Sequence, residues 1–424
     1  MKTIVAKILK ILTYRVLEKQ KPSVITITGS VGKTSTKEGV YFAIKGLGNV
    51  RRSLKNYNNE LGVPFTVALW SDKAPGKNLM RWLKVFYLLS KLACCRDSNY
   101  PKFLVLEIGS DKPGDLQYLM EMMPNGLLKC VVLTAVFGVH LEFFKSIEVV
   151  YQEKITPFKY VADDGLIVVN ADNCDIERIK KDFAGKKIIS YGFEKPADIM
   201  AVDFKAGERG LNFNIKTPKD NFNFLLKQAI SAYQSYPVLA GVAVAMSMGV
   251  DVKEALVNLE AREPLVGRMR LLDGKNNSLI IDDTYNSSPE AVKYALKALK
   301  DLPRAGRKIA VLADMLELGE NADVFHREIG KFAVELGIDY LITLGELSKF
   351  TTNEASKFGM ALSNNLHFET QEQVISCLNN LIKSNDVLLV KGSQGMRMER
   401  VVKAIMAESG KAKELLVRQG EEWA

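Results

Sequence analysis

The fold is decided by Val24-Ile25-Thr26-Ile27-Thr28-Gly29-Ser30-Val31-Gly32-Lys33-Thr34-Ser35-Thr36-Lys37-Glu38. A β-branched run predicts a strand, the glycines predict a turn, and a helix is expected to follow. Glycines let backbone N–H groups surround a phosphate, and a helix N-terminus adds its dipole. A strict P-loop has glycine where Ile27 stands, so this is the shorter T-G-x-x-G-K-T form. The stretch predicts a nucleoside triphosphate site, against the alternative of an ordinary Gly/Ser turn.

The bulk composition is that of a soluble globular protein. A length of 424 residues predicts two or three domains, with 47% hydrophobic and 25% charged residues. Five cysteines without paired metal-ligand spacing favour a reducing compartment. Lys7, Lys10 and Arg15 interrupt the first apolar run, which argues against a signal peptide. We expect a cytoplasmic protein.

The positive charge is concentrated near the N-terminus. Residues 1–96 hold 18 Lys and Arg against 4 Asp and Glu, whereas the whole chain has a net charge of +9. This asymmetry favours an anionic partner: a phosphate-rich ligand, a membrane surface or nucleic acid. Because no aromatic-rich RNA motif or zinc finger accompanies the charge, nucleic acid is the weakest of the three and is not expected.

Two segments, 1–20 and 79–95, have the pattern of basic amphipathic helices. In the first, we expect Val5, Ile8, Leu9, Leu12 and Val16 to share one apolar face. In the second, lysines and arginines cluster on one face. Such helices can lie on an anionic membrane at the inner face of the cell, or they can pack on the core with their lysines in water.

Polar residues follow several buried strands. The runs 103–106, 130–134 and 165–169 read as strands, with Glu107 directly after the first and His140 in the turn after the second. Strands separated by helices predict a mainly parallel α/β sheet, which binds ligands at the carboxyl ends of its strands. Residues 51–64 read as an irregular Asn-rich loop, and 197–226 as an antiparallel flap.

A second α/β pattern starts after residues 262–268, which we interpret as a hinge. Strands are expected at 278–281, 308–312, 340–344 and 386–390, with polar residues at their ends. The sequence therefore predicts an α/β protein: a P-loop domain with a mainly parallel sheet, then a Rossmann-like, doubly wound domain. The predicted boundaries are 1–20 for the N-terminal helix, 21–263 for the central domain with a basic helical insertion at about 73–98, and 264–424 for the last domain.

Several motifs resemble those of Mur ligases. In the central domain they are T-G-S-V-G-K-T-S-T-K-E (28–38), N-Y-N-N-E-L-G-V-P (56–64), L-E-I-G-S-D-K-P-G-D (106–115) and H-L-E (140–142). In the C-terminal domain D-D-T-Y-N-S-S-P (282–289), A-D-M-L-E-L-G (313–319) and V-K-G-S-Q-G-M-R-M-E (390–399) resemble the MurF type. That type adds D-alanyl-D-alanine to a UDP-muramoyl-tripeptide.

The resemblance implies ATP-dependent amide formation through an acyl phosphate, with the C-terminal domain closing on the central one. It implies Mg²⁺, with two ions expected: one on Thr34 and Glu107, and one on His140 supported by a carbamate on Lys154. The implied catalytic residues are Lys33, His140, Lys154 and Arg268. The implied ATP-binding residues are Gly29, Ser30, Val31, Gly32, Lys33, Thr34, Ser35, Arg268, Asp283 and Asn286. The implied substrate-binding residues are Asn58, Asn59, Lys391, Ser393 and Arg397.

The chain departs from the MurF pattern in three places. About twenty residues precede the first strand, so the N-terminal domain that binds the UDP-sugar is expected to be missing. The family's His and Asn near adenine have no counterpart in residues 232–237, so we expect the contacts to adenine to differ. The basic helix at 79–95 resembles an insertion. The resemblance still implies a peptidoglycan-precursor ligase that joins a D-amino acid or dipeptide to a muramoyl-peptide acceptor. We expect it to be a monomer. The alternatives are a Mur-like ligase with a different or membrane-associated acceptor, and a non-catalytic nucleotide-binding scaffold.

Overall fold

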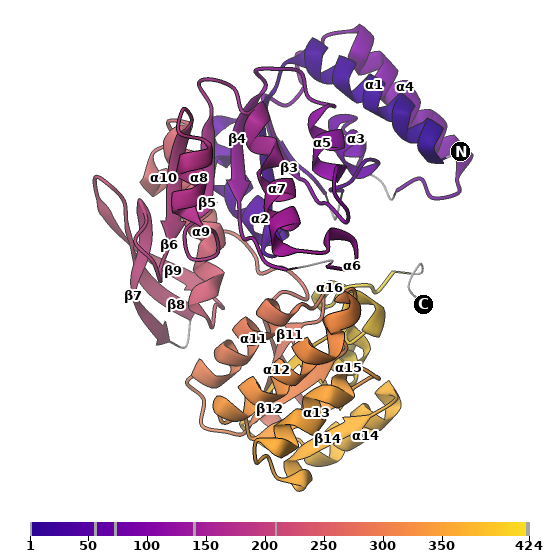
Figure 1. Ribbon diagram of the computed structural model, residues 1–424, viewed down its shortest axis with the longest axis vertical. Helices are drawn as coiled ribbons and strands as arrows, with labels where there is room; N and C mark the ends of the chain where they lie inside the picture. Colours follow the sequence, from indigo (N-terminus) through magenta and orange to yellow (C-terminus); the bar gives the residue numbers. More distant parts are fainter. Residues whose placement is uncertain (1, 55–56, 72–73, 139–140, 208–209, 421–424) are drawn as a thin grey trace. The chain divides into compact units, whose positions relative to one another are not determined.

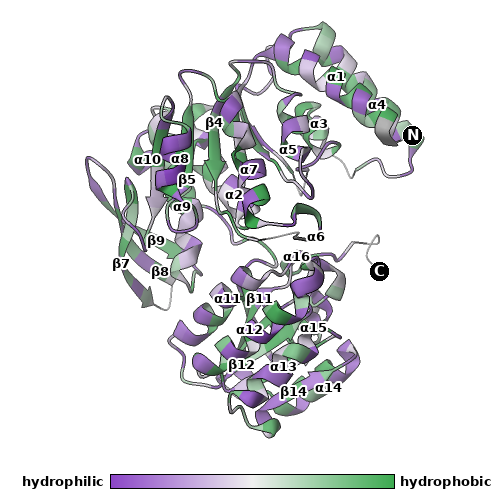
Figure 2. Cartoon of the chain, viewed as in Figure 1, coloured by the Kyte–Doolittle hydropathy of each residue, from purple (hydrophilic) through white to green (hydrophobic). Residues whose placement is uncertain are grey.

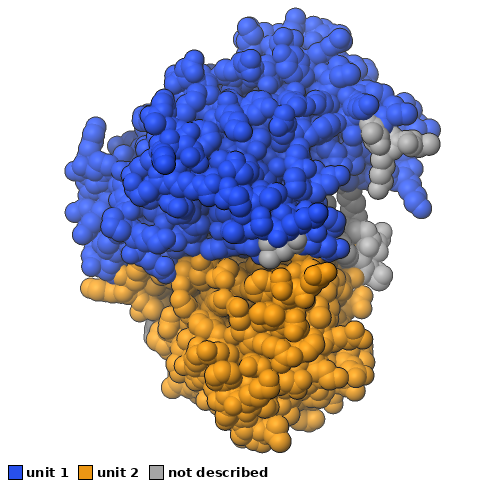
Figure 3. Space-filling view, viewed as in Figure 1, with its two compact units in different colours: residues 1–203, 213–224, 235–262 blue, residues 204–212, 225–234, 263–424 orange. Residues whose placement is uncertain are grey.

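The computed structural model describes residues 2–54, 57–71, 74–138, 141–207 and 210–420. They group into two compact units, drawn in separate colours in Figure 3. Unit 1 contains residues 1–203, 213–224 and 235–262, and unit 2 contains residues 204–212, 225–234 and 263–424.

A nine-stranded sheet has the order β2-β3-β1-β4-β5-β6-β7-β8-β9 (Figure 1). Every pair from β2 to β7 is parallel. The strands are β1 (Ser23–Thr28), β2 (Val50–Arg52), β3 (Phe103–Glu107), β4 (Leu128–Leu133), β5 (Leu166–Asn170), β6 (Lys187–Gly192), β7 (Ile199–Gly207), β8 (Gly210–Lys216) and β9 (Asn221–Lys227). The central strands are almost continuously buried, as expected for parallel strands covered on both faces.

Helices cover both faces of this sheet. One face carries α2 (Lys33–Ala43), α9 (Tyr236–Ser247) and α10 (Val252–Glu260), which pack on one another. The other face shares one hydrophobic core with α1 (Lys2–Gln20), α3 (Gly62–Val67), α4 (Leu79–Cys94), α5 (Asp115–Met120), α7 (Ile147–Ile155) and α8 (Ile176–Asp182). A short helix, α6 (Leu141–Phe144), precedes α7. Figure 2 shows hydrophobic colour along the covered strands and mixed colour on the helices.

Unit 2 contains a six-stranded sheet of order β10-β11-β15-β12-β13-β14, parallel except for β10 against β11. Its strands are β10 (Arg270–Gly274), β11 (Ser278–Asp283), β12 (Lys308–Ala313), β13 (Tyr340–Leu344), β14 (Asn365–Phe368) and β15 (Val387–Lys391). One core contains α14 (Gln371–Leu381), α15 (Glu399–Ile405) and α16 (Ala412–Leu415). The other contains α11 (Pro289–Asp301), α12 (Ala322–Glu335) and α13 (Ser348–Lys357). Alternate strand residues enter the two cores, as in a doubly wound domain.

The predicted fold class is confirmed, and helices form at both amphipathic segments. The predicted irregular loop is wrong at its ends, because β2 and α3 lie there. Pro64 is tolerated in α3 because the first N–H groups of a helix need no intrahelical acceptor. The predicted apolar face of α1 is only partly buried, because Leu9 and Val16 are fully buried but Val5 and Leu12 are half-buried. Ile8 is 43% exposed, whereas Thr13 and Leu17 are fully buried, so the face is rotated toward them.

Candidate active site at the glycine loop

The loop between β1 and α2 requires glycine at two positions. Gly29 has φ +141°, and a Cβ there would lie 2.1 Å from Thr134 Oγ1 and 2.9 Å from Ala135 N. Gly32 has φ +81° and is the N-cap of α2, with no capping side chain among the described residues. The N-terminus of a helix presents backbone N–H groups to an anion, and the helix dipole favours negative charge there.

Residues after β4 hold the loop in this shape. Thr134 Oγ1 lies 2.5 Å from Val31 O and 3.2 Å from Thr28 O, and it can donate its proton to either. Ser30 Oγ donates to Phe137 O and accepts from Phe137 N, both at 2.9 Å. The Ser30 hydroxyl is thus committed to the loop itself. Sequence reasoning missed Thr134, although a polar residue after a buried central strand was a usable signal.

Lys33 begins α2 and lies over the loop. Its Nζ donates to Gly29 O at 2.7 Å and to Ser30 O at 3.3 Å. A phosphate bound at the loop would offer this ammonium stronger, charge-assisted acceptors than the two carbonyls. Thr34 and Ser35 follow in the same turn.

A buried ionic network lies one helical turn further along α2. Lys37 is 1% exposed, and its Nζ lies 3.5 Å from Glu38 Oε1 and 3.8 Å from Glu107 Oε2. Arg52 donates from Nε to Glu38 Oε1 at 2.9 Å, and Asn58 donates from Nδ2 to Glu107 Oε1 at 3.1 Å. Glu107 Oε2 is buried and makes no hydrogen bond to any described residue. A buried carboxylate oxygen without a donor suits a metal ligand.

Lys154, on α7, is a buried amine with an altered pKa. It is 1% exposed, donates from Nζ to Ser110 Oγ at 2.7 Å, and lies 5.9 Å from the centre of the Phe144 ring. Burial, and then the positive charge of Lys33, lower the pKa of Lys154 to about 7. Glu153 counteracts this only in part, and its carboxylate already accepts two backbone N–H groups at the start of α5. A large fraction of Lys154 is therefore a neutral amine at neutral pH.

The remaining predicted central-domain residues have mixed settings. His140 lies outside the described residues, and in the described part of the chain no three His, Cys, Asp or Glu side chains form a metal cluster. Asn58 O accepts from Gly109 N at 2.8 Å, which joins its loop to the end of β3. Asn59 Oδ1 accepts from Gly62 N, the first backbone N–H of α3, at 2.9 Å.

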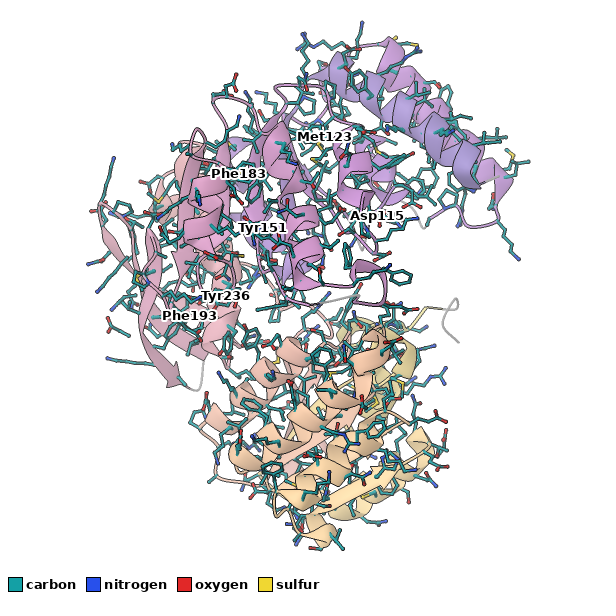
Figure 4. All side chains as sticks on the ribbon, viewed as in Figure 1. Asp115, Met123, Tyr151, Phe183, Phe193 and Tyr236 are labelled. Carbon is teal, nitrogen blue, oxygen red and sulfur yellow. The ribbon has the colours of Figure 1, made fainter. Side chains whose placement is uncertain are left out.

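An aromatic cluster occupies the segment in which we expected altered adenine contacts. Phe193 stacks on Tyr236 with ring centres 4.9 Å apart, and both are labelled in Figure 4. Tyr236 donates its hydroxyl to Asp172 Oδ2 at 3.0 Å, and Asp172 also accepts from Phe193 N at 2.7 Å. This cluster is held by a carboxylate after β5, and sequence reasoning did not single it out.

In unit 2, the ends of β11 and β15 form a second polar cluster. Lys391 Nζ donates to Asp283 Oδ2 at 2.6 Å and to Asn286 O at 2.9 Å. The guanidinium of Arg268 lies 3.9 Å from the centre of the Tyr285 ring. The structure therefore brings three predicted residues together, because the adjacent parallel strands β11 and β15 end at the same edge of the sheet, and it places Arg268 against Tyr285 of the loop after β11.

Two predicted substrate residues have partners within the chain. Ser393 Oγ accepts from Leu316 N at 2.9 Å, and Arg397 donates from Nε to the fully buried Glu399 at 2.6 Å. Sequence reasoning missed Arg418, which donates from Nη1 to Glu399 Oε2 and to Thr284 O, both at 3.1 Å. It also donates to the Tyr285 carbonyl.

A cavity of about 380 Å³ lies beside β2 and is lined by Tyr41, Arg51, Arg52 and their neighbours. None of the predicted site residues lines it. The candidate site is thus defined by its residues and their contacts.

Two family models match the chain. One, the Mur ligase middle domain, matches residues 87–245, and the other, the Mur ligase glutamate ligase domain, matches residues 267–394. The UDP-N-acetylmuramoyl-tripeptide–D-alanyl-D-alanine ligase of Buchnera aphidicola subsp. Acyrthosiphon pisum is 27% identical, over 93% of this chain and 79% of the relative. The enzyme of the same name from Escherichia coli K12 is 27% identical, over 90% and 76%.

Solved structures agree with these matches. The MurF ligase of Thermotoga maritima in complex with ADP has a TM-score of 0.77 at 25% identity, covering 97% of this chain and 84% of that one. MurF from Acinetobacter baumannii has a TM-score of 0.78 at 24% identity and shares the fold, over 93% and 79%. The resemblance predicted from the motifs is confirmed. Because the two models together match more than half of the residues, in the order expected from the motifs, the chain belongs to the Mur ligase family.

Proposed function

We propose that the protein is an ATP-dependent amide ligase of peptidoglycan precursor synthesis. It joins D-alanyl-D-alanine, or a similar amine, to the carboxylate of a muramoyl-peptide. The observation that carries the proposal is the position of the glycine loop. The loop joins β1 to the N-terminus of α2, and β1 is paired with β3, whose last residue is the buried Glu107. The names of the curated relatives supply the substrate class. These substrates imply a cytoplasmic enzyme, and we propose a monomer.

The chain's own residues support phosphate transfer to a carboxylate. In the proposal, the α2 N-terminus and Lys33 hold the β- and γ-phosphates, and Lys33 moves from the loop carbonyls to the phosphate oxygens. Arg268, Asp283 and Asn286 contact the nucleotide. Lys391 orients the amine substrate. Its present ion pair with Asp283 must be shared with that ligand.

The polar groups at the loop fit Mg²⁺. Glu107 offers a buried oxygen without a hydrogen-bond donor among the described residues, and Thr34 offers a hydroxyl in the first turn of α2. One Mg²⁺ held by Glu107 and Thr34, and a second held by His140, would neutralise phosphate charge. A carbamate on Lys154 would add negative charge there, and the lowered pKa of Lys154 supports it because only a neutral amine reacts with CO₂.

The test is product formation by the full chain. We expect Mg-ATP, D-alanyl-D-alanine and UDP-muramoyl-tripeptide to yield ADP and a product heavier by the dipeptide less water, seen by mass spectrometry. Lys33→Met is expected to reduce the rate at least about a hundredfold, because it removes a phosphate-binding charge. Lys45→Met is the matched control, since Lys45 lies outside the site in the turn after α2. ADP formation without any acceptor would refute the proposal.

The two alternatives give different results in the same experiment. A ligase with a different acceptor forms ADP and product only when another muropeptide or carrier is supplied. A nucleotide-binding scaffold binds ATP and forms no product with any acceptor, so Lys154→Ala changes nothing that can be measured as turnover.

A further inference from the structure

The outer faces of α1 and α4 expose many large hydrophobic side chains. Among the described residues, eight of the sixteen exposed large hydrophobics lie on these two helices, and Met80 and Leu79 are 73% and 70% exposed. The others are Ile4, Ile8, Ile11, Tyr14, Leu83 and Tyr87. Scattered exposed hydrophobics need no explanation, but a concentration on two neighbouring helices indicates an interaction surface.

The core of unit 1 does not need these side chains. α1 is anchored through its opposite face by Leu9 and Leu17, and α4 is anchored by Val85 and Leu89, all fully buried. Gln20 joins the two helices by donating from Nε2 to the carbonyls of Leu92 and Cys95, at 2.6 and 2.7 Å. The two helices pack side by side (Figure 1), so their outer faces are held by the fold.

The same surface is basic. Exposed cations on the two helices include Lys7, Arg15, Arg81 and Lys91. Glu18 is the only acidic residue within the bounds of α1 and α4. Lys10 does not contribute, because its Nζ pairs with Glu121 at 2.5 Å. An apolar protein partner would account for the hydrophobic residues alone, and an acidic partner for the cations alone.

We propose that α1 and α4 form a surface that binds an anionic lipid membrane. Apolar side chains would enter the boundary between headgroups and acyl chains, while lysines and arginines contact lipid phosphates. Tyr14 and Tyr87 suit this boundary because their rings are apolar and their hydroxyls are polar. Contact with the membrane is peripheral, because no described helix combines the length and apolar character of a span. This proposal does not depend on the ligase reaction.

The test is flotation of the full chain with vesicles. We expect binding to phosphatidylcholine vesicles containing about one third phosphatidylglycerol at low salt, and at least about tenfold weaker binding to phosphatidylcholine alone. High salt should weaken the binding. The double variant Met80→Glu, Leu83→Glu is expected to bind at least about tenfold more weakly, since it places charge in the apolar layer. Both side chains are exposed, so the fold should be unaffected.

Matched controls remove exposed hydrophobics elsewhere. Val257→Ser and Leu362→Ser, at 69% and 77% exposure, should bind vesicles like the unchanged chain. The proposal is overturned if the chain does not float with anionic vesicles at low salt, or if the Met80, Leu83 variant floats equally well. It is also overturned if that variant loses only self-association, measured by sedimentation velocity, because the face would then bind a second copy. ADP formation is expected to be unchanged in all three variants, which separates this test from that of the ligase reaction.

Discussion

Replacing Lys154 by methionine tests whether this amine is neutral in the folded protein. Methionine is about as long and apolar, so it should fill the same space between Ser110 and Phe144. The amine is fully buried with a serine hydroxyl as its hydrogen-bond partner, and its pKa is lowered to about 7. A protonated Lys154 would place a buried charge in the folded protein and lower its stability, whereas methionine carries no charge and has no such cost.

The sign and size of the effect follow from proton linkage. In the unfolded chain a lysine has a pKa of about 10.4, so between that value and about 7 the unfolded state binds more protons than the folded state. Stability therefore rises with pH in this window. The limit is about 1.4 kcal/mol per pH unit, or about 2 kcal/mol between about pH 7.5 and pH 9.5. The penalty is fully present below about pH 7. Lys154→Met should lack this contribution. The difference in the free energy of unfolding between the unchanged protein and Lys154→Met should therefore change by about 2 kcal/mol between about pH 7.5 and pH 9.5.

Urea unfolding followed by tryptophan fluorescence measures the difference. Trp70 is 2% exposed and Trp82 is partly buried, and both lie in unit 1 with Lys154. The exposed Lys159, five residues further on, supplies the control Lys159→Met. The buffers should be free of CO₂, because a carbamate would change the charge. A difference between the unchanged protein and Lys154→Met that stays constant from about pH 7 to pH 10 would refute a lowered pKa.

Three further substitutions test the supports of the two clusters. Gly29→Ala should abolish ATP binding, measured by calorimetry, because the new Cβ would clash with Thr134. Gly48→Ala is the control and should bind ATP normally, because Gly48 also has a positive φ but has open space around its Cβ. Thr134→Val should weaken ATP binding about tenfold, since the loop carbonyls lose their hydroxyl donor. Arg418→Gln should destabilise unit 2 by about 3 kcal/mol, because the buried Glu399 loses a cation. The loss should appear as faster backbone amide hydrogen exchange across residues 282–289, where Arg418 donates to Thr284 O. Unchanged exchange there would show that the contacts of Arg418 with Thr284 and Tyr285 do not hold this loop.

The sequence was sufficient to place two groups of residues at the edges of parallel sheets. Glu107 and the glycine loop could be placed together because β1 and β3 are adjacent and parallel, and Lys391 and Asp283 could be placed together because β11 and β15 are. What could not be predicted is which hydrogen bonds a polar side chain makes. Ser393 accepts a hydrogen bond from Leu316, 77 residues away, and no local pattern could predict that partner.

Helix faces were predicted less well where a helix packs on another helix. Ile8 and Leu9 differ little in hydrophobicity, but Leu9 enters the core while Ile8 stays exposed. A periodic pattern identifies the apolar stripe, and only the packing of α1 on α3 and α4 decides which part of it is covered. The uncovered part is the surface that we assign to lipid.

The charge of Lys33 should affect the order in which the nucleotide and the proposed carbamate on Lys154 are taken up. The positive charge of Lys33 helps to lower the pKa of Lys154, so a phosphate that neutralises Lys33 would raise that pKa and favour the ammonium form. An ammonium does not react with CO₂. A carbamate on Lys154 should therefore form faster before the nucleotide binds than after it. If so, bicarbonate added before ATP should activate the enzyme at once, whereas bicarbonate added after ATP should activate it with a lag.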